Sequence, residues 1–419
     1  MITDKSIYIG RTLRGDNPLF LTEKMRCGHV QIIGATGRGK TASVVLPWFI
    51  RDLMAGNIPI LIDGKGDESI LYEMQSKLSV DEFQRIAVFD LSNPNSLSLN
   101  PLIGGTPSEI ADRLIQSLEF ESQYFKDIQH AAVLMVLEVL DVCDEAPTLP
   151  RLYELLSDSG KILDLTKKIK YFPEHLLNEV TKFSQTRSDT REERLSGILS
   201  QLKPFNTASF KNLVSGNEID LKAILEQSES TNYRAAVILL NTLQFQKTAK
   251  VFGKMVMQLM AWITATRNPK SNFAPVFIDE FSAFVFEGFE QFLNKARSRN
   301  IGLHLSHQSL GDLEAVSPSF AKTVNVNTNV KVLLGLNDPD TADYMARHLG
   351  TRTKLKSTER AKKDDWGDVE ASGEISLRET ENYKIHPNKL KNFSRGQGVL
   401  SLLVNGYPFT EEVQFDRYK

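Results

Sequence analysis

Cysteine is scarce in this chain, which has only Cys27 and Cys143 in 419 residues. Two cysteines cannot build a disulfide framework, so the composition suits a reducing compartment such as the cytoplasm. Long hydrophobic runs are also lacking. The best run, residues 131–140, is shorter than the roughly 18 residues of a membrane span and contains Glu138. The N-terminus shows no signal-peptide pattern.

An excess of charge of either sign is lacking as well. Lys and Arg number 50, Asp and Glu number 52, and the isoelectric point is about 6.4. Any nucleic acid would therefore have to be held by a local patch, or by a ring of subunits with a basic lumen. With 41% hydrophobic residues the chain has an ordinary globular composition, and its length predicts more than one folding unit.

A glycine-rich stretch directly follows the apolar run at residues 30–33. Its sequence, G-A-T-G-R-G-K-T, fits the phosphate-binding pattern G-x-x-x-x-G-K-[ST] and precedes a segment with a helical pattern. Glycines allow successive backbone N–H groups to turn toward phosphate oxygens, and the next helix adds its positive end. The predicted nucleotide-binding residues are Gly34, Ala35, Thr36, Gly37, Arg38, Gly39, Lys40 and Thr41.

Two acidic residues follow the apolar strand predicted at residues 275–278. These residues, Asp279 and Glu280, would lie at the carboxyl edge of a parallel sheet, where ligands of α/β folds bind. In the predicted site Lys40 reaches the β and γ phosphates, and the Thr41 hydroxyl ligates Mg²⁺. Asp279 holds the same ion through water, and Glu280 polarises the attacking water.

Three further positions are candidates for roles around the same reaction. Gln308 ends the strand predicted beside Asp279 and is placed to sense the γ-phosphate. Arg297 and Arg299 precede that strand, so one of them could reach a neighbouring subunit's site as an arginine finger; a solvated basic helix end is the alternative. Lys65, in the turn D-G-K-G-D, could contact substrate or a neighbouring subunit, or be a salt-bridged turn lysine.

The distribution of helix and strand patterns predicts the fold class. Strands and helices alternate over residues 30–90 and again over 235–349, which is typical of a parallel sheet covered on both faces. Residues 354–381 predict a loop or hairpin, and residues 398–413 a terminal hairpin. We predict an α/β fold with an inserted all-α domain. The predicted parts are 1–106 and 231–419 for the nucleotide-binding domain, and 107–230 for the helical insertion.

Six motifs occur in order along the chain. They are V-V-L-P at 44–47, L-I-D-G-K-G-D at 61–67, L-N-P-L at 99–102, F-I-D-E-F at 277–281, A-R at 296–297 and H-Q-S-L at 307–310. This ordered set resembles the coupling-protein ATPases of type IV secretion and bacterial conjugation. The resemblance rests on the set and not on the phosphate-binding loop, which many unrelated NTPases share. Gly64, in the second motif, departs from the family pattern, in which proline is usual at that position.

The resemblance implies a RecA-like P-loop ATPase that binds ATP with Mg²⁺. It also implies a ring of six identical subunits that translocates single- or double-stranded DNA, or delivers relaxase or effector proteins, to the components of a secretion channel. Its all-α domain would meet DNA and the relaxase. The roles carried over are Mg-ATP binding for Lys40 and Thr41, the Walker B pair for Asp279 and Glu280, the phosphate sensor for Gln308 and the trans finger for Arg297.

The beginning of the chain departs from this family, whose members usually carry N-terminal transmembrane helices. We expect either a cytoplasmic portion without its anchor or a member held through a membrane-anchored partner, at the inner face of the bacterial cytoplasmic membrane. Two alternatives remain. One is another RecA-like DNA translocase or a secretion-channel assembly ATPase. The other is a receptor organised by ATP binding without turnover, against which the intact pair of Asp279 and Glu280 argues.

Overall fold

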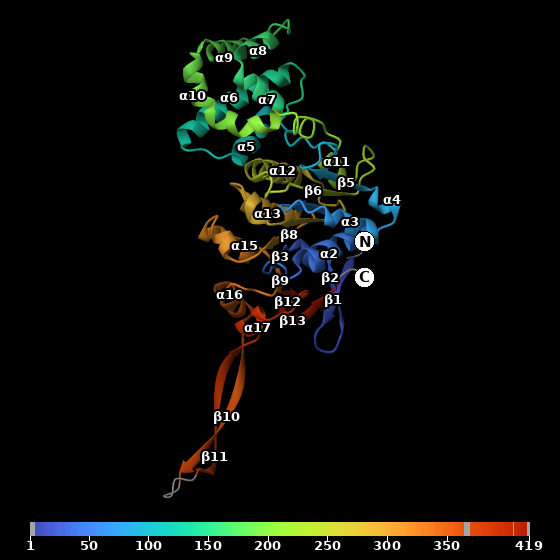
Figure 1. The fold of residues 1–419 in the computed structure, drawn as a ribbon, viewed down its shortest axis with the longest axis vertical. Helices are drawn as coiled ribbons and strands as arrows, with labels where there is room; N and C mark the ends of the chain where they lie inside the picture. The colour runs from blue at the N-terminus through green and yellow to red at the C-terminus, as the bar shows by residue number, and fades with distance from the viewer. Residues whose placement is uncertain (1–4, 364–368, 405, 417–419) are drawn as a thin grey trace.

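The computed structural model describes residues 5–363, 369–404 and 406–416, and for residues 354–363 and 369–380 it describes the backbone alone. A large sheet occupies the middle of the molecule, a group of helices forms one end, and a two-stranded ribbon projects from the other (Figure 1). Within the described ranges no helix combines the length and the apolar character needed to cross a bilayer.

The central sheet has eleven strands and is mostly parallel. All pairs from β5 to β9 in the spatial order are parallel, and those from β9 to β2 are antiparallel. In spatial order the strands are β5 (Ile86–Asp90), β6 (Ala235–Leu239), β4 (Ile60–Asp63), β7 (Ala274–Asp279), β8 (Ile301–His307), β3 (Val30–Ile33), β9 (Val330–Leu334), β12 (Gln397–Val404), β13 (Tyr407–Phe415), β1 (Ser6–Thr12) and β2 (Pro18–Thr22).

Both faces of the parallel strands are buried, which is why these strands are nearly continuous apolar runs. Ile60 and Ile62 of β4 belong to the core under α12 and α13, whereas Leu61 belongs to the core under α2 and α3. These two helix pairs lie on opposite sides of the sheet (Figure 1). The helices that flank the sheet are α1 (Glu23–Cys27), α2 (Leu46–Met54), α3 (Ser69–Lys77), α4 (Val80–Phe83), α12 (Gln246–Thr266), α13 (Phe289–Ser298), α14 (Gly311–Glu314), α15 (Pro318–Asn327), α16 (Pro339–Leu349) and α17 (Pro387–Lys391).

The helical region begins at a capping box, in which the Thr106 side chain accepts the Glu109 N–H and Glu109 accepts the Thr106 N–H. Its buried side chains join those of the sheet in one continuous core, so the proposed domain boundaries at 107 and 230 stay a prediction. The helices are α5 (Pro107–Ser117), α6 (Gln123–Val142), α7 (Leu149–Ser157), α8 (Ser159–Thr166), α9 (Glu174–Gln185), α10 (Ser188–Leu202), η2 (Lys203–Asn206) and α11 (Leu221–Glu226).

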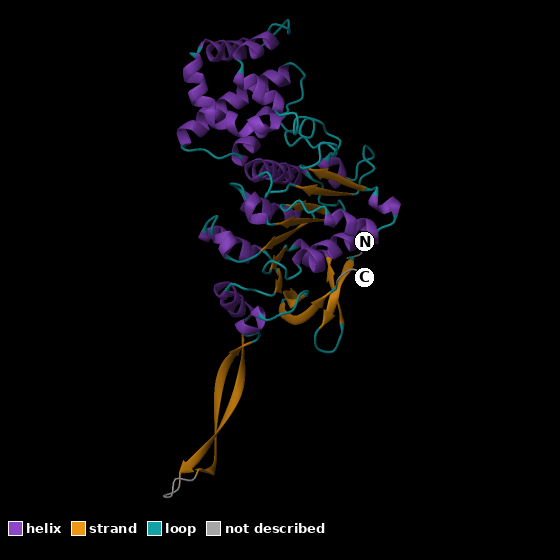
Figure 2. Ribbon diagram, in the orientation of Figure 1, coloured by secondary structure: helices purple, strands orange, loops and turns teal. Residues whose placement is uncertain are grey.

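The projecting ribbon consists of β10 (Thr351–Lys363) and β11 (Val369–Tyr383), paired antiparallel (Figure 2). Of the loop and the hairpin that the sequence left open, the hairpin is the one that forms. The terminal hairpin of β12 and β13 is also as predicted, and Gly406 has the positive φ of 84° that such turns require. Asn405, which precedes Gly406 in the sequence, lies outside the described residues.

Candidate active site

The phosphate-binding loop follows β3 at the carboxyl edge of the sheet. Gly37 and Gly39 have φ angles of 79° and 95°, in the left-handed region that glycine tolerates. A β-carbon on Gly39 would lie 3.0 Å from the Ser43 hydroxyl. The start of the loop is tied to its neighbours, because the Gly34 N–H donates to the His307 carbonyl of β8 at 3.3 Å. The loop therefore has the backbone that a phosphate cradle needs.

The helix after the loop divides in two. Residues Lys40–Val45 (η1) are π-helical, so that the Leu46 N–H donates to the Thr41 carbonyl, and the α-helical part α2 begins at Leu46. Pro47, in the first turn of α2, has no N–H to donate, and an irregular helix start is expected beside it. The Lys40 ammonium donates to the Gly34 carbonyl at 2.6 Å across the loop. Burial lowers the pKa of Lys40, and the charge of Asp279 opposes that shift.

Asp279, at the end of β7, is fully buried and accepts several hydrogen bonds. Its Oδ2 accepts from the Thr41 hydroxyl at 2.9 Å and from the Lys65 ammonium at 3.1 Å, and its Oδ1 accepts from the Ser306 hydroxyl at 2.7 Å. Burial by itself would raise the pKa of Asp279, but the Lys65 charge and these hydrogen bonds outweigh it and lower the pKa. The carboxylate is therefore held ionised, as a metal-binding group must be.

Asp63 pairs in register with Asp279 across β4 and β7 and is also fully buried. Its Oδ2 accepts the Gly66 N–H at 2.7 Å, while its Oδ1 has no hydrogen-bond partner among the described residues. Burial, followed by the charge of Asp279, raises the pKa of Asp63 to about 7. At the edge of the site, an acid whose pKa is raised to about 7 thus lies beside one whose pKa is lowered.

The shifted pKa of Asp63 predicts a pH dependence of stability. A carboxyl group whose pKa is raised by folding contributes stability that is fully present when the pH is below its pKa in the unfolded chain, near 4. That contribution is lost as the pH rises through its pKa in the folded protein, about 7. Asp63→Asn cannot ionise, so we expect its unfolding temperature relative to the parent to rise by a few degrees between pH 5 and pH 8. Thermal unfolding without nucleotide measures this difference. Asp67→Asn, at an exposed carboxylate of the same turn, is the control, and parallel curves for Asp63→Asn and the parent would contradict the assignment.

Glu280 directly follows β7 in a left-handed conformation, with a φ of 56°. This conformation is costly for a non-glycine residue and recurs at functional sites, where it aims a side chain that an extended chain would direct elsewhere. Glu280 lines the same cavity as Lys40, Lys65, Asp279 and Gln308. The cavity has a volume of about 530 Å³, within the range of small-molecule sites.

Gln308, which directly follows β8, lies beside the phosphate-binding loop. Its Oε1 accepts a hydrogen bond from the Thr36 hydroxyl at 3.0 Å, and its backbone N–H donates to Asp312 at 2.8 Å. β8 lies between β7 and β3, so its last residues stand between the acidic pair and the loop. A side chain here contacts the loop directly, which a phosphate sensor requires.

Arg297 and Arg299 lie at the other end of β8, away from this cavity. The strand has seven residues, so its ends are on the order of 20 Å apart. The Arg299 guanidinium donates to the Arg267 carbonyl at 2.8 Å and is thereby held within its own chain. Arg297 is exposed near the end of α13. The structure therefore places neither arginine at its own phosphate loop, and it leaves Arg297 the more accessible of the two.

Sequence reasoning missed two contacts of Asp279. The sequence allows Lys65 to be a substrate contact or a salt-bridged turn residue, and its partner in the structure is Asp279 itself. The ion pair favours the second interpretation, but it places Lys65 inside the site. The second contact is Ser306, which lies two residues before Gln308 on the strand beside Asp279. A polar residue at that register position was the available signal.

The residues predicted to hold Mg²⁺ fit that ion. The Thr41 hydroxyl and the Asp279 carboxylate are 2.9 Å apart, and both are hard oxygen ligands. The described residues contain no group of three or more His, Cys, Asp or Glu side chains that could hold a metal by themselves. A P-loop magnesium site needs no such group, because substrate phosphates and water complete the coordination.

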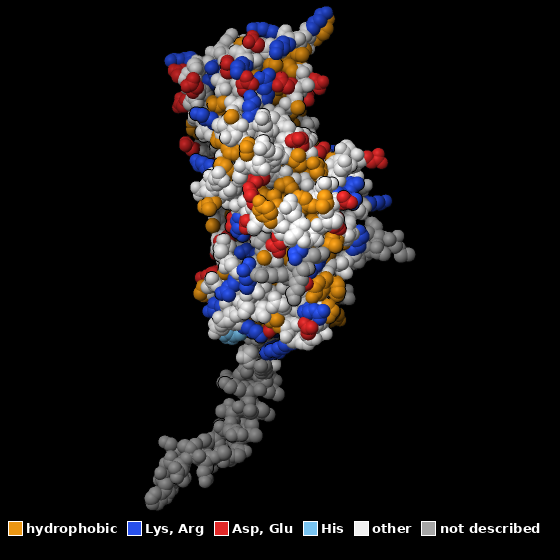
Figure 3. Space-filling view, turned by 45° about the vertical axis from the view of Figure 1, so that its right-hand side comes forward, with side chains coloured by type: hydrophobic (Ala, Val, Ile, Leu, Met, Phe, Trp, Pro, Cys, Tyr) orange, Lys and Arg blue, Asp and Glu red, His pale blue; other side chains and the backbone are white. Residues whose placement is uncertain are grey.

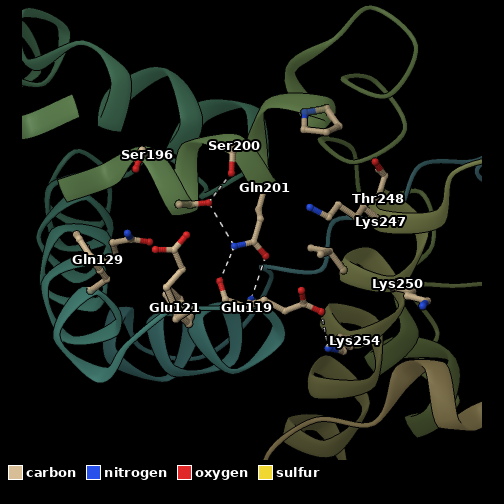
Figure 4. Close-up of a pocket in the computed structure, with 15 residues that line it drawn as sticks. Glu119, Glu121, Gln129, Ser196, Ser200, Gln201, Lys247, Thr248, Lys250 and Lys254 are labelled. Carbon is tan, nitrogen blue, oxygen red and sulfur yellow. Dashed lines mark hydrogen bonds and ion pairs between the residues drawn. The ribbon is translucent and has the colours of Figure 1, made fainter. Parts of the chain in front are cut away.

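A second cavity, of about 500 Å³, lies between the helical region and α12 (Figure 4). Glu119 and Glu121 line it from the helical region, and Lys247, Lys250 and Lys254 line it from α12. The Lys254 ammonium is 3.8 Å from the Glu119 carboxylate across this cavity. Lys250 also lines the first cavity, so one helix connects the candidate active site with the helical region.

Comparison with known proteins gives a family and a fold. A family described as type IV secretory system conjugative DNA transfer matches residues 1–379. The type 4 coupling protein DotL of Legionella pneumophila is 22% identical in an alignment 403 residues long, and the alignment covers 80% of this chain and 51% of DotL. The chain thus spans about half the length of this curated relative.

Solved structures with the same fold are related to this chain only distantly in sequence. The bacterial conjugative coupling protein TrwBdeltaN70 aligns with a TM-score of 0.66 at 15% identity, over 98% of this chain and 90% of that one. VirB4 of Thermoanaerobacter pseudethanolicus aligns with a TM-score of 0.60 at 15% identity, over 98% and 96%. The predicted fold class, a mostly parallel RecA-like α/β sheet with helices on both faces, is confirmed.

Proposed function

The chain belongs to the family of type IV secretory system conjugative DNA transfer proteins, and from this premise we propose that it is an ATP-hydrolysing coupling protein. It recruits DNA or protein substrates and drives their passage to a secretion channel. The observation that carries the proposal is that Lys40, Asp279, Glu280 and Gln308 line one cavity, and that the Thr41 hydroxyl is bonded to Asp279. These are the parts of a phosphoryl-transfer site, assembled at the ends of three strands, β3, β7 and β8.

Each residue has a separate task in this proposal. The Lys40 ammonium binds the β and γ phosphates, while Thr41 and Asp279 hold Mg²⁺, which neutralises charge on the phosphate oxygens. The Glu280 carboxylate orients a water in line with the γ-phosphate and accepts its proton. Gln308, already bonded to Thr36 of the loop, detects whether the γ-phosphate is present.

The choice of nucleotide and ion is supported by a related structure. TrwB has been solved in complex with ADP and Mg²⁺, and that structure aligns with 98% of this chain at a TM-score of 0.65. The cavity beside the loop is large enough for a nucleotide. We assign ATP as the substrate and Mg²⁺ as its ion on this basis.

The proposal includes an assembly and a set of partners. The active form is a ring of identical subunits, six in number, in which Arg297 of one subunit completes the site of the next. Positive and negative side chains are interspersed over the helical end in Figure 3, without a field of one sign on that face. Tight DNA binding is therefore assigned to the ring and not to a single subunit. Relaxase or effector proteins and secretion-channel components are the other partners, at the inner face of the cytoplasmic membrane.

Helix α12 is proposed to transmit motion from the candidate active site to the helical region. This helix lines the nucleotide cavity and the second cavity with the same side chain, Lys250, and carries Lys247 and Lys254 on the wall that faces the helical region. A shift of α12 on hydrolysis would change the separation of these lysines from Glu119 and Glu121. Such a shift would move the helical region, which is proposed to face the substrate, relative to the central sheet.

The test of the proposal is the ATPase rate per subunit as a function of protein concentration, with and without single-stranded DNA. We expect the rate to rise steeply with concentration, because each site needs a residue from a neighbour, and to rise further with DNA. A rate that does not depend on concentration would contradict shared sites. Tight ATP binding without turnover would support the receptor alternative. Hydrolysis without a DNA response would favour protein delivery.

A further inference from the structure

A lysine is buried beneath the candidate active site with no charged partner. Lys331, on β9, is 2% exposed. Its ammonium donates to Gln31 Oε1 and to the Asn325 carbonyl, each at 2.7 Å, and contacts the Thr328 hydroxyl. No carboxylate among the residues with described side chains forms an ion pair with it. Such burial of a basic group is costly, so its retention calls for a physical reason.

The hydrogen bonds continue from Lys331 across two neighbouring strands. Gln31 of β3 uses its Oε1 to accept from Lys331, so its Nε2 faces His307 Nε2 of β8 at 3.0 Å. An amide nitrogen can only donate, so His307 Nε2 must accept. The proton of the ring then lies on Nδ1, which donates to the Ser309 carbonyl at 2.7 Å.

One tautomer of the neutral His307 ring satisfies the whole series of hydrogen bonds. Burial lowers the pKa of His307 to about 4, so the ring is neutral near pH 7. Burial also lowers the pKa of Lys331 to about 7, but either form of its amino group carries enough hydrogens for the Gln31 and Asn325 oxygens. The orientation of the Gln31 amide therefore determines the His307 tautomer.

His307, the last residue in this series of hydrogen bonds, contacts the segment that carries Gln308. The His307 ring is bonded to the carbonyl of Ser309, two residues on, and Gln308 lies between them. Gln308 in turn accepts from Thr36 of the phosphate-binding loop. Lys331, Gln31 and His307 lie on β9, β3 and β8, which are adjacent in the sheet. Strand β3 leads directly into the phosphate-binding loop. A change at Lys331 can thus reach the sensor through two side chains.

We propose that Lys331 is a positioning residue for the phosphate sensor: it fixes the Gln31 amide, which fixes the His307 tautomer and thereby the turn that carries Gln308. Gln31, His307 and Lys331 together form a sensor relay. The inference rests on the proposed function, because it assigns the relay to ATP hydrolysis. The relay itself can be measured without turnover.

The first test is the tautomer of His307, observed by ¹⁵N NMR of the full chain labelled at histidine. We expect the parent to show His307 with its proton on Nδ1, and His307→Gln identifies the signal by its loss. Lys331→Met removes the donor but keeps the length and the buried volume, so the fold should persist. Its His307 should shift toward the Nε2–H tautomer. A parent with the proton on Nε2, or an unchanged tautomer in Lys331→Met, would overturn the proposal.

The second test separates positioning from stability. Gln31→Glu gives Lys331 a carboxylate partner, so this variant should fold well. It also presents an acceptor to His307 in place of the amide donor, so it should still break the relay. We expect both variants to lower kcat about tenfold or more with KM for ATP within about twofold, because a displaced sensor affects the chemical step. Lys322→Met, an exposed lysine of α15, is the matched control and should match the parent.

The two tests distinguish this inference from the proposed function. If the parent does not hydrolyse ATP, the proposed function fails, while the tautomer experiment still decides whether the relay exists. If the parent hydrolyses ATP and both variants retain the parent's kcat, the positioning role is overturned and the function stands.

Discussion

Glu280→Gln should lower kcat for ATP hydrolysis by about 10²–10⁴-fold and leave the affinity for ATP within about threefold. The size follows from the loss of general-base catalysis, because an amide cannot accept the proton of the attacking water. Binding should survive, since the phosphates are assigned to the loop and Lys40, neither of which changes. Single-turnover hydrolysis and equilibrium binding of ATP at saturating protein concentration measure the two quantities separately.

Glutamine at position 280 keeps the shape of the side chain and does not alter the left-handed backbone at this residue. Thermal unfolding of Glu280→Gln should therefore match that of the parent. Glu290→Gln, at an exposed carboxylate of α13, is the control for the loss of one negative charge. A Glu280→Gln protein that hydrolyses ATP at the parental rate would contradict the assignment of the base and transfer the role to another group.

The main parts of the site were predictable because each follows a strong apolar strand. Thr41 and Asp279 are 238 residues apart in the chain and 2.9 Å apart in the structure. Parallel strands bring their carboxyl ends to one edge whatever the length of the connection. The helical region between these residues therefore alters the spacing in sequence and not the geometry of the site.

The contacts that depend on strand order were not predictable. Lys65 bonds to Asp279 because β4 lies beside β7, and nothing in the local sequence states that neighbour relation. The same holds for the antiparallel part of the sheet, where β1 pairs with β13 from the opposite end of the chain. Local patterns identify strands, whereas the pairing of distant strands is decided by tertiary packing.

The buried polar relay could not be predicted for a related reason. Gln31, His307 and Lys331 lie on three different strands. In the sequence each is a single polar residue in an apolar run, and such a residue is more often a local irregularity than a member of a hydrogen-bonded network. Only the register of β9, β3 and β8 brings them into hydrogen-bond contact. The role of a buried polar group depends on its hydrogen-bond partners, and partners that are distant in sequence can be identified only from the fold.

Arg297→Ala should remove assembly-dependent hydrolysis, with a loss of about 10³-fold or more in kcat at high protein concentration. The guanidinium lies at the edge of the sheet opposite its own phosphate loop, so its proposed action is on a neighbouring subunit. Binding of ATP to a single subunit should not change. Arg299→Ala is the comparison: its guanidinium is bonded to the Arg267 carbonyl, so its loss should lower stability more than catalysis.

Mixing two inactive variants tests directly whether Arg297 acts on a neighbour. A subunit with Arg297→Ala still has Glu280, and a subunit with Glu280→Gln still has Arg297, so a mixed ring forms some complete sites. Random equal mixing should restore activity to about one quarter of the parental sites, since each half of a site is intact with probability about one half. Recovery requires that the two residues of one site come from different subunits. If the mixture stays inactive although both variants enter the same ring, Arg297 does not act in trans.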